Sequence, residues 1–323
     1  MKKIFLFFAL CAAFVCSAGT LSACSERTQN EKFSVVCTIF PQYDWVRNLT
    51  EGNENVELTI LQASGQDLHN FQPSAADLVK IYRCDVFIYV GGESDAWVES
   101  ILSDSSVNPD MKCIDLLAAL GDAALTEEEV PGAAHDHEED HDHAEALDEH
   151  VWLSLSNANV LLKVICNAIC EADPAEAELY RSNLERYSAE VSALEGEYSQ
   201  MVADAERTVI LFGDRFPFRY LAEDYGLTYY AAFSGCSAET EASFSVITNL
   251  ARAVDENNLP YILVLENSDR GIAEQIRNNT SSKDQGILVM NSIQSVTAAQ
   301  IADGTTYLAL MRGNFETLRT ALN

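Results

Sequence analysis

Short apolar runs alternate with stretches of helical periodicity along most of the chain. Runs rich in β-branched and aromatic residues predict strands, and apolar residues spaced by three or four positions predict the helices between them. The predicted strands are FSVVCTIF, VELTILQ, DVFIYVGG and KCIDLL in the first half, and TVILFGD, LTYYAAF, YILVLENS and ILVMNS in the second. Such alternation is typical of α/β proteins with parallel sheets. We therefore predict two similar α/β lobes with mostly parallel sheets, at residues 33–172 and 207–323.

One long helix is predicted between the lobes, over residues 174–205 of a linking segment at residues 173–206. Pro174 suits the first turn of this helix. Its apolar positions alternate spacings of four and three and so form one stripe: Tyr180, Leu184, Tyr187, Val191, Leu194, Tyr198 and Met201. A coiled-coil dimer would show a similar stripe. A helix that lies across both lobes explains the stripe within one chain, and we expect a monomer.

The N-terminus predicts an exported, lipid-anchored protein. Lys2 and Lys3 precede an apolar stretch and then small residues, as in a secretory signal peptide. The last four residues, LSAC, resemble the lipobox of bacterial lipoproteins, in which the cysteine becomes the lipidated N-terminus. We predict a signal peptide at residues 1–23, acylation of Cys24 and a tether at residues 24–32, and so an extracytoplasmic protein at the membrane surface. An ordinary signal peptide or a signal anchor is the alternative.

Charge excludes one class of partner. The chain has 20 Lys and Arg against 50 Asp and Glu, a formal net charge of -30. A surface with this charge repels phosphate backbones, so nucleic acid is not expected as a partner. The same surface raises the local concentration of cations.

Six cysteines remain after Cys24 and the two in the signal peptide are set aside: Cys37, Cys84, Cys113, Cys166, Cys170 and Cys236. None belongs to a CxxC motif, and spacing does not give a disulfide pairing. Their redox state stays open.

Five of the six histidines lie in one acidic stretch, HDHEEDHDHAEALDEH, which ends at His150. Large apolar residues are almost missing from residues 121–149, and we expect a mobile loop there. His150 lies directly after this loop, at its ordered end. Four histidines inside the loop are expected to capture metal transiently as an auxiliary site: His135, His137, His141 and His143. A solvated linker with incidental histidines is the alternative.

Three features fall where predicted strands end, which is where open α/β sheets bind ligands. His69 lies in QDLHNFQPSAADL, after the second strand. His150 lies in DEHVWLS, at the end of the acidic loop, and the pair Asp214 and Arg215 ends the strand TVILF.

The two histidine motifs closely resemble those of the zinc- and manganese-binding solute-binding lipoproteins of ABC importers. The resemblance extends over essentially the whole predicted mature chain. It implies two α/β lobes joined by one rigid helix, with one metal ion in the cleft between them and two ligands from each lobe. It also implies that His69 and His150 are the ligands from the first lobe. The protein would then deliver metal to an ABC permease and would not be an enzyme.

The second lobe departs from that family pattern. Arg215 stands where the family has a histidine or glutamate ligand, and Asn291 stands at the fourth ligand position. Asp214 and Glu266 are the carboxylates that we expect as ligands instead. The alternative is that Asp214 and Arg215 form a structural ion pair, with water completing a site of His69 and His150.

The acidic histidine-rich loop favours Zn²⁺ as the cargo, because such loops in the family occur mostly in zinc members. Manganese is the second candidate, since the second-lobe ligands stay unassigned and Mn²⁺ prefers oxygen donors. A secreted metallohydrolase is a distant alternative, but the chain has no HExxH motif. Cell adhesion is a further alternative role for a surface lipoprotein of this kind.

Overall fold

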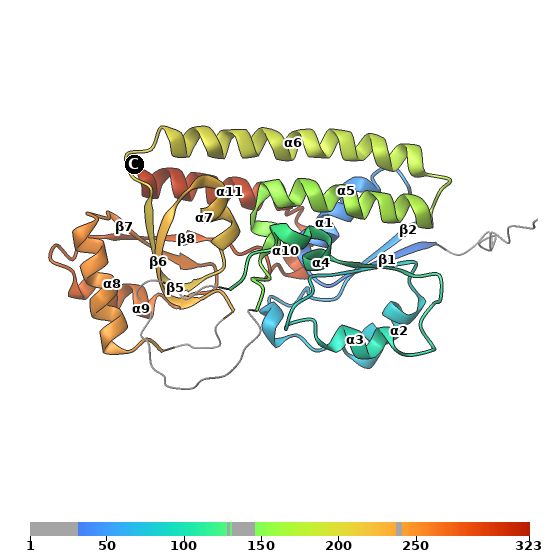
Figure 1. Ribbon diagram of the computed structural model, residues 1–323, viewed down its shortest axis with the longest axis horizontal. Helices are drawn as coiled ribbons and strands as arrows, with labels where there is room; N and C mark the ends of the chain where they lie inside the picture. Colours follow the sequence, from blue (N-terminus) through green and yellow to red (C-terminus); the bar gives the residue numbers. More distant parts are fainter. Residues whose placement is uncertain (1–31, 128–129, 131–145, 237–240) are drawn as a thin grey trace, which may run out of the picture. The chain divides into compact units, whose positions relative to one another are not determined.

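Two parallel sheets organise the chain (Figure 1), as seen in a computed structural model that describes residues 32–127, 130, 146–236 and 241–323. The first sheet has the order β2-β1-β3-β4 and comprises β1 Phe33–Cys37, β2 Val56–Ile60, β3 Val86–Tyr89 and β4 Lys112–Asp115. The second has the order β6-β5-β7-β8 and comprises β5 Val209–Phe216, β6 Thr228–Ser234, β7 Tyr261–Leu265 and β8 Gly286–Met290. Each paired strand runs parallel to its neighbour, which confirms the predicted fold class.

Helices follow the strands of the first lobe. They are α1 Phe40–Leu49, η1 Leu68–Asn70, α2 Ala75–Arg83, α3 Trp97–Leu102, α4 Leu116–Leu120, η2 Gly121–Ala123, η3 Val151–Leu153 and α5 Leu155–Ala172. The start of α2 is fixed by a capping box between Ser74 and Asp77. Ser74 Oγ accepts the N–H of Asp77, and the Asp77 carboxylate accepts the N–H of Ser74 at 3.1 Å.

The long helix α6 spans Ala177–Ala203 and begins three residues later than expected, because Pro174 lies in a turn that precedes it. It runs alongside α5 of the first lobe and α11 of the second (Figure 1). Asn183 Nδ2 donates to the carbonyl of Leu49 in α1 at 2.9 Å. Tyr198 Oη donates to the carbonyl of Met311 in α11 at 2.6 Å. One buried stripe on α6 thus packs against both lobes.

The second lobe adds five helices within its described residues: α7 Arg219–Tyr225, α8 Phe244–Glu256, α9 Gly271–Asn279, α10 Ala298–Ala302 and α11 Tyr307–Leu322. The helix α7 ends at Gly226, whose φ of 64° is in the left-handed region that glycine tolerates. The short helix α10 was not predicted.

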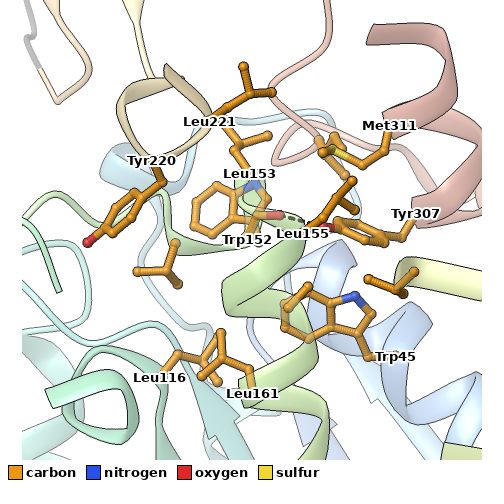
Figure 2. Packing of buried hydrophobic residues seen from close by; sticks show 14 of the residues in the cluster. Trp45, Leu116, Trp152, Leu153, Leu155, Leu161, Tyr220, Leu221, Tyr307 and Met311 are labelled. Carbon is orange, nitrogen blue, oxygen red and sulfur yellow. Dashed lines mark hydrogen bonds between the residues drawn. The ribbon is translucent and has the colours of Figure 1, made fainter. Parts of the chain in front are cut away.

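Buried aromatic side chains pack where the two lobes meet (Figure 2). Trp152 of η3 donates its indole N–H to the carbonyl of Ser292, after β8, at 2.8 Å. Tyr307, at the start of α11, donates its hydroxyl to the carbonyl of Trp152 at 2.6 Å. Its ring meets Trp45 of α1 edge-on, with the centroids 5.3 Å apart. Since Trp152, Tyr307 and Trp45 are all fully buried, this junction is a packed core.

Several predicted features fall outside the described residues: the signal peptide, Cys24 with almost all of the tether, and the loop histidines His135, His137, His141 and His143. Among the helices that the structure describes, none combines the length and the apolar character that a membrane crossing requires.

Candidate metal centre

His69 and His150 face each other, with their ring centroids 5.6 Å apart. His69 belongs to η1 in the loop after β2. Asp67 caps that turn by accepting the N–H of His69 at 3.1 Å. His150 immediately precedes η3 and is fully buried, whereas His69 is partly buried. The fold therefore brings together two imidazoles that are far apart in the sequence, at the carboxyl edge of the first sheet.

The imidazole of His150 is fixed by Asp148. One carboxylate oxygen, Oδ1, accepts the backbone N–H of His150 at 2.8 Å and lies 3.0 Å from its ring Nδ1. Because a carboxylate only accepts, Nδ1 carries the proton, and in the neutral imidazole Nε2 presents its lone pair. Among the described residues, Nε2 of His150 has no hydrogen-bond partner. A carboxylate behind one nitrogen with the other left open is the arrangement that orients metal-binding histidines.

His69 is oriented by Ser94 and Glu149 in the same way. Its Nδ1 lies 2.6 Å from Ser94 Oγ and 3.5 Å from Glu149 Oε2. The other carboxylate oxygen of Glu149 accepts the backbone N–H of Ser94 at 2.8 Å. Nε2 of His69 also has no hydrogen-bond partner within the described part of the chain. Two buried, unpartnered imidazole nitrogens thus belong to one small region.

Cys236 adds a third donor from the second lobe. One donor atom from each of His69, His150 and Cys236 lies within 4.8 Å of the other two. The cysteine follows β6 in a turn, and Glu127 Oε1 accepts its backbone N–H at 3.3 Å. From its sequence, Cys236 was expected only to be one of six cysteines of open redox state. Its place just beyond a strand end was the signal that could have singled it out.

The electrostatic environment differs between these groups. Burial, and then the neighbouring His150, lower the pKa of His69 to about 4. Burial also opposes a charge on His150, but the nearby carboxylates, Asp148 foremost, outweigh it and raise its pKa. Burial, followed by the charge of Glu127, raises the pKa of the Cys236 thiol. His69 is therefore neutral near pH 7, the form in which an imidazole binds metal.

Arg215 does not approach the cluster as a donor. Its guanidinium pairs with Asp67 of the first lobe, Nη2 to Oδ2, at 2.5 Å. The amide of Gln294 lies 3.4 Å from the same oxygen. The arginine thus supports the turn that carries His69.

The expected second-lobe carboxylates lie apart from the three donors, in a pocket of about 170 Å³ that Asp67 and Arg215 also line. Asp214 accepts backbone N–H groups of Arg215 at 2.8 Å and Leu265 at 3.3 Å. Glu266 accepts the N–H of Ser292 at 2.9 Å and its hydroxyl at 2.7 Å. Among the described residues, neither carboxylate belongs to the group of three donors.

The remaining family position, Asn291, is also engaged. Its side-chain oxygen accepts the N–H of Ile293 at 2.7 Å, and its own N–H donates to Asn314 at 2.7 Å. These bonds shape the turn after β8, so the side chain of Asn291 serves local structure here.

The two ends of the acidic loop are held together beside the site. Glu127 donates its N–H to the carbonyl of Ala146 at 2.6 Å, and Asp148 donates to that of Leu125 at 2.8 Å. Tyr220 of α7 bonds both ends, accepting from Leu125 at 3.0 Å and donating to the carbonyl of Asp148 at 2.8 Å. The expectation of a mobile loop over all of residues 121–149 therefore fails at its last residues, because Asp148 and Glu149 are buried.

Comparison with known proteins identifies the family to which this two-lobed chain belongs. The family model for the periplasmic zinc-uptake complex component A, ZnuA, matches residues 35–321. The chain belongs to the ZnuA family. The resemblance inferred from the two histidine motifs is thereby confirmed at the family level.

Individual members of the family show the extent of the match. The chain is 32% identical over 328 residues to the zinc-binding lipoprotein AdcA of Streptococcus pneumoniae, a match that covers 99% of this chain and 61% of that protein. It is 27% identical to the high-affinity zinc uptake system protein ZnuA of Bacillus subtilis, over 97% of this chain and 95% of that one. The Zn(II)-bound ZnuA-like domain of S. pneumoniae AdcA superposes with a TM-score of 0.69 at 26% identity, covering 90% of this chain and 99% of that domain. The chain thus corresponds to about 61% of the length of the AdcA protein.

Proposed function

We propose that this protein is an extracytoplasmic receptor that captures Zn²⁺ and delivers it to an ABC-type permease for import. One observation carries the proposal: the buried Nε2 atoms of His69 and His150 have no hydrogen-bond partner within the described residues, and the two histidines lie in a cluster with a third donor. A buried polar atom without a partner is costly in a folded protein. A bound cation would satisfy both nitrogens at once.

In this proposal His69 and His150 are direct ligands. Asp148 and Glu149 lie behind them and hold the rings in place. Imidazole nitrogen suits zinc better than manganese, which prefers oxygen donors. Family members named for zinc binding and zinc uptake, including the AdcA and ZnuA relatives, support the same metal.

Zinc is the cargo in this scheme, and no reaction is assigned to the protein. A receptor needs affinity, selectivity and release, which the buried ligands and the two-lobed frame can supply. The predicted acylation of Cys24 would hold the receptor at the membrane surface, beside the permease. The name of the S. pneumoniae relative, a zinc-binding lipoprotein, supports that placement.

The ligand roles of Asp214 and Glu266 stay predictions. Both carboxylates already accept hydrogen bonds from backbone N–H groups, and Glu266 also accepts the hydroxyl of Ser292. Their pocket includes Asp67, two residues before His69, so approach on metal binding would involve the Asp67–Arg215 pair.

Calorimetric titration of chelator-stripped protein with Zn²⁺ and Mn²⁺ in parallel tests the proposal. We expect one tight zinc site and weaker manganese binding. His69→Ala or His150→Ala should weaken the tight site by more than about 100-fold, beyond the roughly 10–100-fold typical of outer-shell residues. His141→Ala is the matched control and should leave it unchanged. Full zinc affinity in either site variant would refute the assignment, and Asp214→Ala tests the remaining carboxylate in the same assay.

A further inference from the structure

We propose that Cys236 is a direct thiolate ligand of the zinc ion and replaces the second-lobe histidine or glutamate of the family pattern. This inference rests on the proposed zinc-receptor function and specifies the donor set of its site as two nitrogens and one sulfur. Arg215 occupies the position of the missing family ligand, so the second lobe needs a donor from another element.

The distances suit one shared metal ion. The donor atoms of His69, His150 and Cys236 all lie within 4.8 Å of one another. Donors around one tetrahedral zinc, with bonds of about 2.0–2.3 Å, stand roughly 3.3–3.8 Å apart. Each pair of donors therefore has to approach by at most about 1.5 Å to share one zinc ion.

The ring of His150 lies against the turn that carries Cys236. Asp148 occupies Nδ1, which leaves the Nε2 and Cε1 edge of the ring for another neighbour. That neighbour is Gly235: a Cβ placed on it would lie 3.1 Å from His150 Cε1 and 3.0 Å from the carbonyl oxygen of Phe216. A side chain at this position would therefore be tightly packed against the ring, and glycine lets the turn approach it without that contact.

Strand order explains how a cysteine so far along the chain can replace a ligand at position 215. In the second sheet β6 lies directly beside β5, with Arg215 paired to Phe233 and Phe216 paired to Ser234. Cys236 follows Ser234 by two residues. The thiol thus comes from the strand end adjacent to the one that carries the family's usual ligand.

The metal ion itself has to stabilise the thiolate, because burial and nearby acidic side chains oppose a negative charge on the Cys236 sulfur before metal binds. Arg215 is directed to Asp67 at 2.5 Å and stabilises the turn before His69. Coordination requires the thiolate, so the thiol proton leaves to solvent as zinc binds, and the sulfur contributes the negative charge that a carboxylate ligand would bring. A soft sulfur donor also favours zinc and cadmium over manganese.

Cobalt substitution of the full chain tests the inference directly. Co²⁺ bound to a thiolate shows an intense sulfur-to-metal charge-transfer band in the near ultraviolet. We expect this band in the wild type and in Cys113→Ser, a control at an exposed free cysteine. The band should be absent from Cys236→Ser, with zinc affinity at least about 10-fold lower. Cys236→His should keep tight zinc binding without the band.

The outcomes separate the two proposals. Tight zinc or cobalt binding without a thiolate band in the wild type would overturn the role of Cys236 while the receptor function stands. A band that persists in Cys236→Ser would do the same. Absence of tight metal binding in the wild type would overturn both. The wild-type spectrum needs no variant to fold, and circular dichroism checks that each variant does.

Discussion

Arg215 of β5 and Asp67 of the first lobe form an ion pair across the two lobes, with the guanidinium nitrogen 2.5 Å from the carboxylate. Asp67 also caps the short turn that presents His69. The residue at the family's third ligand position therefore supports the turn that carries His69, a proposed ligand from the other lobe. Substitutions at position 215 should then act first on this turn, because the guanidinium pairs with Asp67.

Replacing Arg215 with alanine should reduce stability and spare the metal site. The change leaves the carboxylate of Asp67, 14% exposed, without its guanidinium partner. We expect the free energy of unfolding in urea to fall by about 1–3 kcal/mol, while tight zinc binding persists. Asp67→Asn in the same background should recover part of that loss. Arg186→Ala, which breaks an exposed pair with Glu51, is the control and should have a smaller effect. Loss of tight zinc binding in Arg215→Ala would contradict the positioning role.

Asp148→Asn should lower zinc affinity without unfolding the protein. The carboxylate accepts both the N–H and the ring Nδ1–H of His150, and so selects the tautomer that exposes Nε2. An amide in this place can present its NH₂ group and favour the wrong tautomer. Calorimetry should show affinity about 10–100-fold lower than in the wild type. Asp110→Asn, at an exposed position, is the control. Unchanged affinity would mean that packing alone orients the ring.

Deletion of residues 132–144 tests the four loop histidines. These residues lie outside the described part of the chain, but the described ends of the loop are joined by the bond from Glu127 to Ala146. We expect fewer zinc ions bound per protein at saturation, with the tightest site retained. Measurement requires a zinc titration of both forms. If the tightest site disappears, the loop contributes to the primary centre.

Two glycines should respond oppositely to alanine. A Cβ on Gly213 in β5 would lie 2.6 Å from the Cα of Ala273 in α9, closer than packed atoms allow. Gly213→Ala should therefore cost about 1–3 kcal/mol of unfolding free energy. Gly196, in the exposed middle of α6, has nothing within 4 Å of such a Cβ. Gly196→Ala should stabilise by about 0.5–1 kcal/mol. Equal effects in thermal or urea unfolding would show that α9 yields to accommodate the methyl group.

Asp95 should make stability depend on pH. This buried carboxyl accepts N–H groups of Val90 at 2.7 Å and Gly91 at 3.2 Å, yet burial raises its pKa from 3.8 to about 7. The folded protein then holds the proton more tightly than the unfolded chain. The resulting stability is complete below pH 3.8 and is lost as the pH rises through about 7.

The slope of this loss is at most about 1.4 kcal/mol per pH unit. Asp95→Asn should flatten that decline. Its free energy of unfolding should exceed that of the wild type most above about pH 7. Urea unfolding across this range measures the difference, with Asp110→Asn as a surface control. Parallel pH profiles for wild type and Asp95→Asn would exclude this source of pH dependence.

The sequence determined the elements of the fold, because hydrophobic periodicity reports directly on which positions face a core. It predicted the alternation of strands and helices and the long helix between the lobes. It did not predict the exact start of α6 or the short helix α10. Both depend on turns, at Pro174 and after β8, whose conformation is set by contacts in the folded protein. The motifs around His69 and His150 also stood out in the sequence alone, and the structure brings the two rings together.

Tertiary structure decided the second half of the site. From the sequence, Asp214 in β5 and Glu266 after β7 were the expected donors, but the chain alone does not reveal which strand will lie beside β5. The order β6-β5-β7-β8 places the end of β6, and with it Cys236, next to His150. Strand order follows from how helices pack on the sheet, a long-range property without a local signature. The sequence by itself therefore specified the elements and the two histidines, while the packing of the sheet determined which third donor they meet.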